Sequence, residues 1–399
     1  NKSFNLGIKK QTNPTNLTNK MTQHVSYNKM ENNNAKNLSA LDKTHQYVLT
    51  EKIHGTNSSC YIVFDSEGEY TIQHGKRTAL VGKGEKFYNI QDVMKPYEET
   101  MVDCAKHVLY ELGHDHCNKT VIFFGEIYGG HYNNTKSPGS MMVQKWMDYA
   151  PGNHFAGFDI VVKQSSEEDS EPFPISYLKF KEAMETYNIP TVPEVMRGSL
   201  EELMKNYNPN KAISIVSKVL HNLNDVEKPE CEGAVLRPLN SNDFENRLKW
   251  KAAKYCDRPP RKTFQELKAE EQEFQNCLEY CNINRLESVM SHHGSEFFMD
   301  PKKFGEIIKF VNQDIMKDVE QDYPKIYNDD KKKKRLWSAL SKKANPMIKK
   351  FINEWLPDDA SHEDRILRQE MRTKEASLDI SSLRMKLDSI KNRVDTLSG

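Results

Sequence analysis

The chain has 399 residues, and its 57 Lys and Arg are balanced by 57 Asp and Glu, so the formal net charge at pH 7 is zero. This balance lacks the basic excess of many nucleic-acid-binding domains, so any such surface must be local. No run of about 18 apolar residues occurs, which excludes a membrane-spanning helix. The length suits two or three domains.

The cysteines indicate the redox environment. Seven of them are scattered from Cys60 to Cys281, an odd number that does not resemble a secreted disulfide framework. We therefore expect an intracellular, reducing compartment. The cytoplasm is the first expectation, and the mitochondrion and the nucleus are the alternatives.

The first part of the chain combines strand and helix patterns. Residues 1–24 are rich in Asn, Thr and Lys and predict a disordered polar tail. Within residues 25–256, short apolar runs predict strands at 45–52, 58–65, 70–75, 120–130, 154–163, 232–239 and 247–255. Helices are predicted at 90–112, 176–187 and 199–222. These elements do not alternate as regular βαβ units, so we expect an α+β domain.

The last helix of this part has a start signal. Ser199 and Glu202 have the spacing of a capping box, in which each side chain bonds the backbone of the other residue. This signal predicts a helix that begins immediately after Ser199.

The second part of the chain reads as helical. The segment DRPPRKT at 257–263 predicts a linker, and residues 264–357 predict an all-α C-terminal domain. Residues 300–350 hold 14 Lys and Arg, including KKKKR at 331–335, so a local positive surface is available. Its alternatives are a solvated helical face and a nuclear import signal.

A final helix is predicted at 362–399. Apolar residues spaced by three and four recur there, as in the a and d positions of a short coiled coil. They are Ile380, Leu383, Leu387, Ile390, Val394 and Leu397. This pattern favours either packing on the same chain or association with a second copy or a partner helix through residues 376–397.

Polar residues interrupt several predicted strands. In EKIHGTN, Lys52 and His54 are two apart and therefore share a face of an extended segment. Lys249 and Lys251 share a face in the same way. A lone lysine in a strand is most often a solvated edge residue, but this domain carries further interruptions of a similar kind. They are Arg77, Glu126, Phe158 beside Asp159, Glu232 and Arg237.

These blocks, in this order, resemble the covalent nucleotidyltransferases, the superfamily of ATP-dependent ligases and capping enzymes. EKIHGTN looks most like the RNA ligases of the phage RNA ligase 2 and kinetoplastid RNA-editing type, which have His where DNA ligases usually have Asp. SYNKMEN at 26–32 resembles the start of their catalytic domain, and the likeness extends over residues 25–256. It implies an ATP-grasp-like adenylation domain of antiparallel sheets with flanking helices, followed by a helical domain that engages RNA.

The resemblance implies a chemistry that suits these residue types. Lys52 would accept AMP from ATP as a phosphoramidate and pass it to an RNA 5′-phosphate, which the 3′-hydroxyl then attacks. A lysine is protonated at neutral pH and must be activated before it attacks. Lys249, Lys251, a divalent metal and partial desolvation would favour the neutral amine.

The resemblance also implies roles for the residues around the nucleotide. Glu126 would hold the ribose hydroxyls, and Phe158 would stack on adenine. Lys249 and Lys251 would neutralise charge on the α-phosphate. Glu232 would bind Mg²⁺ or Mn²⁺.

The remaining roles concern the substrate ends. His54 and Asn57 would orient the phosphate or the RNA end, and Arg77 would grip a phosphate or ribose near the nick. Arg237 stands where the family often has lysine, which keeps the charge and changes the geometry. Glu51 is either near the adenine, as in the family, or a surface carboxylate.

Asp159 and the basic segment complete the candidate residues. Asp159 is either a ligand or a structural hydrogen-bond partner. Phosphate contacts with the RNA are expected at Lys331, Lys332, Lys333 and Lys334.

The sequence thus predicts an ATP-dependent RNA ligase that seals nicks in duplex RNA. The alternatives are an ATP-dependent DNA ligase, a capping guanylyltransferase, or a non-catalytic RNA-binding scaffold with the ligase fold. His54 and the helical C-terminal part argue against the first two. The set of buried charges, which would be costly in an inactive relative, argues against the third.

Overall fold

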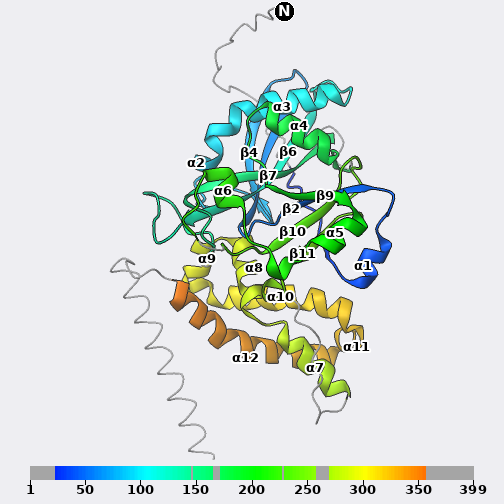
Figure 1. The fold of residues 1–399 in the computed structure, drawn as a ribbon. Coiled ribbons are helices and arrows are strands. Elements are labelled where there is room, and N and C mark those ends of the chain that lie inside the picture. Colours follow the sequence, from blue (N-terminus) through cyan, green and yellow to red (C-terminus); the bar gives the residue numbers. More distant parts are fainter. Residues whose placement is uncertain (1–22, 145–146, 165–170, 227–228, 258–268, 356–399) are drawn as a thin grey trace, which may run out of the picture.

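The structure is a computed structural model, shown in Figure 1. It describes residues 23–144, 147–164, 171–226, 229–257 and 269–355. The predicted tail at 1–24, except its last two residues, lies outside the described residues, as do the predicted linker beyond residue 257 and the predicted helix at 362–399 with its heptads.

Two sheets form the first part of the molecule. The five-stranded sheet has the order β1 (Glu31–Asn32), β11 (Leu248–Lys251), β10 (Gly233–Pro238), β2 (Gln46–Glu51), β9 (Glu194–Ser199). The six-stranded sheet has the order β5 (Ala79–Leu80), β4 (Tyr70–Lys76), β3 (Thr56–Phe64), β6 (Lys119–His131), β7 (Ala150–Gln164), β8 (Phe173–Pro174). All strand pairs of these sheets are antiparallel except β1 with β11. The predicted strands are confirmed, except that the last one ends at Lys251 and Ala253–Tyr255 form a 3₁₀ turn.

The polar stretch EKIHGTN connects the two sheets. β2 ends at Glu51 in one sheet and β3 begins at Thr56 in the other, so the pair is not a hairpin. Gly55 lies so close to β6 that a Cβ atom there would be 2.3 Å from the carbonyl oxygen of Ile127. Only glycine fits this approach, which brings the connection against the neighbouring sheet.

Helices cover the six-stranded sheet and form the largest core with it. The predicted helix at 90–112 is α2 (Ile90–Met94), a 3₁₀ turn at Lys95–Tyr97, and α3 (Glu98–Glu111). The predicted helix at 176–187 is α4 (Tyr177–Thr186). Apolar residues of α2, α3 and α4 pack with β3, β6 and β7 in one buried cluster. A short helix, α1 (Ala35–Ala40), precedes β2.

The expected helix at 199–222 is wrong as a single element. It forms α5 (Leu200–Asn206), a 3₁₀ turn at Pro209–Lys211, and α6 (Val216–His221). Pro209 has no amide hydrogen and disfavours the helical conformation of the residue before it, which explains the break. The capping box of Ser199 and Glu202 is confirmed at the start of α5.

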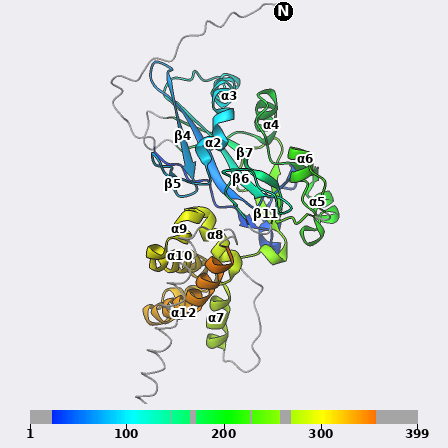
Figure 2. The same cartoon turned by 90° about the vertical axis from the view of Figure 1, so that its left-hand side faces the viewer.

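The second part of the molecule is helical, as predicted. It consists of α7 (Ala269–Glu279), α8 (Ile283–His293), α9 (Ser295–Met299), a 3₁₀ turn at Pro301–Lys303, α10 (Phe304–Asp322), α11 (Pro324–Tyr327) and α12 (Asp330–Trp355). Its buried apolar residues, from Phe274 to Ile352, form a separate core. In both views α8 and α9 lie on the side facing the sheets, and α7 and α12 lie farther away (Figures 1 and 2). Within the described ranges, no helix combines the length and the apolar character that crossing a bilayer requires.

Candidate active site

A cavity of about 600 Å³ lies between the sheets and the helical part. Its walls come from residues 26–32, the β2–β3 connection, β6, β7, β10 and β11 on one side, and from α8 and α10 on the other. The eleven residues predicted for nucleotide chemistry all line it: Glu51, Lys52, His54, Asn57, Arg77, Glu126, Phe158, Glu232, Arg237, Lys249 and Lys251.

Backbone pairing sets Lys52 beside Glu232. The amide of Lys52 donates to the carbonyl of Gly233 over 2.9 Å, and the amide of Ala252 donates to the carbonyl of Glu232 over 2.9 Å. Gly233 has φ = +144°, and a Cβ atom there would lie 2.1 Å from the carbonyl oxygen of Trp250. The glycine therefore permits the close approach of β10 to β11 that brings these segments together.

The Glu232 carboxylate is the electrostatic centre of the site. Its Oε2 lies 2.7 Å from Nζ of Lys52 and 3.0 Å from Nδ1 of His54, and its Oε1 lies 3.0 Å from Nζ of Lys251. The Glu232 side chain is 1% exposed. Burial alone would raise the pKa of Glu232, but Lys52, Lys251 and His54 hold it well below its usual value.

Three cations surround the predicted metal ligand Glu232. A divalent ion at this carboxylate would share its oxygens with Lys52, His54 and Lys251 or displace one of them, so Glu232 as a metal ligand stays a prediction. In the part of the chain that the structure describes, no three His, Cys, Asp or Glu side chains are grouped as a metal site.

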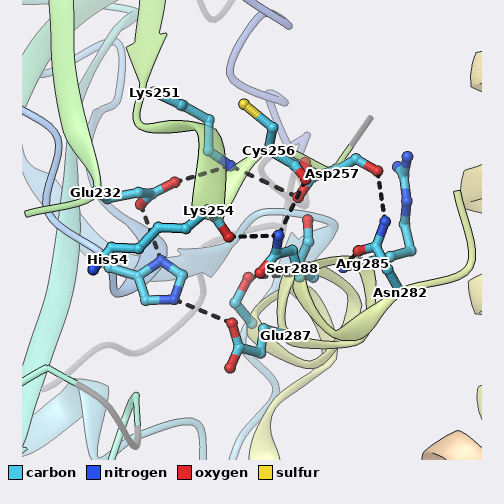
Figure 3. Close-up of polar contacts among 12 residues, drawn as sticks. His54, Glu232, Lys251, Lys254, Cys256, Asp257, Asn282, Arg285, Glu287 and Ser288 are labelled. Carbon is cyan, nitrogen blue, oxygen red and sulfur yellow. Dashed lines mark hydrogen bonds and ion pairs between the residues drawn. The ribbon is translucent and has the colours of Figure 1, made fainter. Parts of the chain in front are cut away.

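His54 lies between two carboxylates from different parts of the chain (Figure 3). Its Nδ1 faces Glu232, and its Nε2 lies 3.5 Å from Oε2 of Glu287 on α8. The second contact has ion-pair distance without hydrogen-bond alignment. Burial would lower the pKa of His54, but Glu232 and Glu287 together raise it to about 9, so the ring is a cation at neutral pH.

Lys249 differs from the other cations of the site. It is half-buried on β11, and no hydrogen bond or ion pair joins its ammonium group to another residue of the described ranges. Burial first, and then the charges of Lys251 and Lys52, lower the pKa of Lys249 to about 8. A part-buried ammonium without an anion is costly, and it suits a site that receives phosphate.

Glu126 and Phe158 lie on neighbouring strands at the cavity. Glu126 is paired across the ladder with Asn57, so these two side chains point to the same face. Phe158 packs edge-on against Tyr27, with ring centroids 5.0 Å apart. Burial raises the pKa of Glu126 to about 7 against the opposing charge of Lys52. A carboxyl in this setting is well placed to accept hydrogen bonds from a bound polar molecule.

Replacing Glu126 by glutamine should change how stability depends on pH. Between pH 4.5 and about 7 the folded protein keeps a proton on Glu126 that the unfolded chain releases, so wild-type stability falls as the pH rises through this window. The amide does not titrate. The free energy of unfolding of Glu126→Gln, relative to that of the wild type, should therefore increase with pH, by at most roughly 3 kcal/mol by about pH 8.

Urea unfolding of both proteins at several pH values measures this difference. Exposed Glu182→Gln is the control and should show no such trend. A Glu126→Gln advantage that stays constant between pH 4.5 and about 8 would refute the account of this carboxyl.

Glu51 is buried, which rules out the surface-carboxylate alternative. It is 2% exposed, and its Oε2 accepts the amide hydrogen of Ile215 over 2.8 Å. Its Oε1 has no hydrogen-bond partner among the described residues. Burial raises the pKa of Glu51 to about 7, although hydrogen bonds from the segment that starts at Ser214 oppose this.

Arg237 belongs to a buried network around Asp159. Its guanidinium donates to the carbonyl of Phe158 over 2.6 Å and to Asp159 over 3.2 Å. Asp159, which is 0% exposed, also accepts hydrogen bonds from Arg247 and from the hydroxyl of Tyr27. Of the two interpretations of Asp159, a ligand or a structural hydrogen-bond partner, these contacts favour the second. Arg237 anchors the strand that carries Phe158, although it also lines the cavity.

Arg77 follows β4 at the cavity and forms no ion pair with any residue in the described ranges. It lies near α8, because the hydroxyl of Thr78 donates to the carbonyl of His292 over 3.5 Å. Arg77 is therefore available to a bound anion at the boundary between the two parts of the molecule.

Several cavity residues come from the helical part and were missed from the sequence. Arg285 donates to Asp314 and Asp318, over 2.6 Å in each case, and Lys29 pairs with Asp318 at 3.5 Å. Glu287 faces His54. The only signal for them was the presence of charged residues inside amphipathic helices, which does not reveal the long-range partner.

The four lysines at 331–334 lie outside the lining of this cavity. They are at the start of α12, where the amides of Lys331 and Lys332 bond Asp329 over 3.0 Å. Nζ of Lys333 lies 3.5 Å from the centroid of the Tyr327 ring. Any contact that they make with RNA is thus outside the lining of the cavity.

Comparison with known proteins agrees with this architecture. The sequence model of the RNA ligase family matches residues 45–251, which is more than half of the chain, and the model of the T4 RNA ligase 2 C-terminal domain matches residues 264–355. A search of curated proteins found no match.

Solved structures with some likeness include RNA ligases of Naegleria gruberi. A variant with AMP and Mn has a TM-score of 0.38 and 14% identity, covering 58% of this chain and 57% of that chain. The form with PPi has a TM-score of 0.36 and 15% identity, covering 61% and 62%. This chain thus spans less than two thirds of their length. The matches to the two family models show that the chain belongs to the RNA ligase family, in the branch that carries a T4 RNA ligase 2 C-terminal domain.

Proposed function

We propose that this chain is an ATP-dependent RNA ligase that seals nicks with a 3′-hydroxyl and a 5′-phosphate in double-stranded RNA, through AMP bound covalently to Lys52. The observation that carries the proposal is the setting of the Lys52 amine. It borders a cavity with an unpaired cation, Lys249, and a protonatable carboxyl, Glu126, in the segment that matches the RNA ligase family.

In the first step Nζ of Lys52 attacks the α-phosphorus of ATP. The ammonium must separate from Glu232, 2.7 Å away, and lose one proton to solvent before it attacks; the nitrogen loses a second proton to solvent once the N–P bond has formed. The new N–P bond replaces the bond from the α-phosphorus to its bridging oxygen, and pyrophosphate leaves with that electron pair. Lys249 and Lys251 would stabilise the negative charge that gathers on the α-phosphate oxygens.

The later steps move AMP from the protein to RNA. An oxygen of the RNA 5′-phosphate attacks the phosphorus of lysyl-AMP, and the P–N electron pair returns to Lys52, which takes up a proton. The RNA 3′-hydroxyl then attacks the activated 5′-phosphate, loses its proton, and AMP leaves. His54, Asn57 and Arg77 would orient the phosphate and the RNA ends.

The other predicted roles concern AMP itself. Phe158 would stack on adenine, Glu126 would accept hydrogen bonds from the ribose, and the free Oε1 of Glu51 would accept one from the base. The requirement for Mg²⁺ or Mn²⁺ stays a prediction. Glu232 as arranged is neutralised by cations, so a metal would have to bind elsewhere or reorganise this group.

The family and the shape of RNA support this substrate class. Duplex RNA is A-form and is recognised through phosphates and 2′-hydroxyls with little sequence preference. We expect ribonucleotides to be required on the 3′-hydroxyl side. Comparing ATP with GTP, on nicked RNA and nicked DNA, separates this proposal from a DNA ligase or a capping enzyme. A protein that binds nicked RNA but never forms protein-AMP would instead be a scaffold.

The basic segment of α12 provides a test of RNA binding outside the cavity. Removing the charges of Lys331, Lys332, Lys333 and Lys334 should flatten the dependence of log affinity on log salt, by roughly one per lysine that contacts a phosphate. Binding of a nicked RNA duplex at a series of salt concentrations measures the slope.

The control removes four exposed lysines from the first part of the molecule: Lys36, Lys43, Lys179 and Lys205. If the slope of the α12 variant equals that of the wild type, these lysines only form a solvated face and do not bind RNA.

A further inference from the structure

Tyr149 bonds the backbone of the connection that carries Lys52 and His54. Its hydroxyl accepts the amide hydrogen of His54 over 3.0 Å. Residues 52–55 lie between β2 and β3 and belong to neither sheet, so a strand ladder does not supply the partner of this amide. Backbone amides inside proteins are nearly always paired. The side chain of Tyr149 thus takes the place of a neighbouring strand at this point.

The backbone on both sides of Tyr149 is held in place. The next residue, Ala150, begins β7 and pairs with His131 of β6. The preceding residue, Asp148, accepts the amide hydrogen of Asn133 over 2.9 Å. Tyr149 therefore extends from a fixed point of the sheet, as a group that positions another residue must do.

The ring of Tyr149 is buried in an apolar cluster that also holds the connection. This cluster contains Ile53, the residue between Lys52 and His54, and Tyr128 of β6. The rings of Tyr149 and Tyr128 meet edge to face, with centroids 5.7 Å apart and an interplanar angle of 87°. The hydroxyl of Tyr128 lies 2.9 Å from Nε2 of His221. Two phenols of one core thus serve different partners.

The hydroxyl of Tyr149 stays protonated. Burial, and then the charge of Glu51, hold the pKa of Tyr149 well above its usual value. A neutral phenol can accept the amide hydrogen of His54, but it is not a base for the Lys52 amine. The contact therefore holds the backbone and does not transfer protons.

The amide of His54 is the point from which two side chains of the site are aimed. Nζ of Lys52 and Nδ1 of His54 reach the same oxygen of Glu232, at 2.7 and 3.0 Å. A shift of the backbone at this amide would move both side chains relative to that oxygen. It would also move Nζ of Lys52 relative to the phosphorus that it attacks, and reacting groups must be held within about 0.5 Å of the productive geometry.

We propose that Tyr149 is a positioning residue for lysine adenylylation, acting through the backbone amide of His54. This inference rests on the proposed function. It assigns the task to the segment that precedes β7, within the adenylation part of the chain. The side chain that binds the backbone is buried behind the connection and does not line the cavity.

The kinetic test uses Tyr149→Phe, which removes one oxygen atom and keeps the ring. The protein is mixed with excess ATP and Mg²⁺ without RNA, and protein-AMP is followed over a single turnover. We expect the rate constant to fall roughly tenfold, because misplaced reacting groups readily lose this much. The final amount of protein-AMP and the ATP concentration at half-maximal rate should hardly change, because Tyr149 is not expected to touch ATP. An unchanged rate constant refutes the role.

Tyr128→Phe is the matched control. It removes a hydroxyl from the neighbouring ring of the same cluster, whose partner is His221, and should keep the wild-type rate constant. If both variants slow the step equally, the loss of any hydroxyl from this core explains the result, and the role through the amide of His54 is refuted. A Tyr149→Phe protein with a lower final amount of protein-AMP and a wild-type rate constant is partly unfolded, which also contradicts the role.

A second test needs no nucleotide. Hydrogen exchange of the His54 amide is measured at single-residue resolution in the wild type and in both variants. The amide should be protected in the wild type and in Tyr128→Phe, and it should exchange roughly tenfold faster in Tyr149→Phe, since its acceptor is then absent. Free exchange in the wild type, or equal exchange in all three proteins, would overturn the pairing. If the wild type formed no protein-AMP, the proposed function would fail, whereas these exchange rates would still be measurable.

Discussion

Replacing Lys52 by methionine should abolish protein-AMP formation and reduce ATP-dependent sealing of nicked RNA by at least about 10³-fold, because no other group would supply the nucleophile. The same variant should still seal a nick whose 5′-phosphate already carries AMP, because that step does not need the lysine as nucleophile. Gel assays with labelled ATP and with pre-adenylylated nicked RNA measure the two activities separately.

Lys254→Met is the matched control for this experiment. Lys254 is exposed, lies three residues after the cavity lysine Lys251 in a different side-chain environment, and pairs with Glu230 at 2.9 Å. It should keep both activities. A Lys52→Met protein that accumulates protein-AMP at the wild-type rate would show that another residue carries the nucleotide.

Replacing Lys249 by methionine should reduce the rate of protein-AMP formation by about 10²- to 10³-fold and, at the same time, stabilise the fold. The rate falls because a cation aimed at the α-phosphate is lost. The stability rises because Lys249 is an ammonium without a partner among the described residues, with its pKa lowered to about 8.

The sign of the pH dependence follows from linkage. The unfolded chain binds the proton of Lys249 more tightly than the folded protein does, so wild-type stability rises with pH between about 8 and 10.5. Below about pH 8 the charge costs the wild type at most roughly 3 kcal/mol. The advantage of Lys249→Met in urea unfolding should therefore be complete near neutral pH and shrink toward pH 10.5.

Lys251→Met provides the contrast for the Lys249 variant. Lys251 lies two residues away on the same strand, but it pairs with Glu232 at 3.0 Å and with Asp257 at 3.7 Å. Its loss should destabilise the fold by roughly 1–3 kcal/mol, because Glu232 stays buried with fewer partners. If Lys249→Met destabilises the protein as Lys251→Met does, the unpaired-cation account of Lys249 is wrong.

The strands of the adenylation part could be predicted because their signals are local. Runs such as those of β3 and β6 are long, apolar and rich in β-branched or aromatic residues, and alternation placed Lys249 and Lys251 on one face. Strand β9 was missed, because EVMRGS contains few strand-forming residues and is half exposed. It pairs with β2 through tertiary structure that a local pattern does not contain.

The residues that make up the site could be predicted from the sequence, but the contacts between their side chains could not. Residue types and the family resemblance brought Lys52, Glu232 and Lys251 together, but they did not show that three cations surround both oxygens of Glu232. The contact of His54 with Glu287 joins residues 233 positions apart, and the local sequence of α8 does not indicate which distant residue Glu287 contacts. Such contacts depend on docking of the two parts of the molecule.

The central claim is that the amine of Lys52 captures the nucleotide. Incubating the wild-type protein with ATP and Mg²⁺, digesting it, and locating the AMP adduct by mass spectrometry tests this most directly. We predict an acid-labile, alkali-stable adduct on the peptide that contains Lys52 and on no other. AMP on a different residue, or no adduct under conditions in which nicked RNA is sealed, would contradict the account.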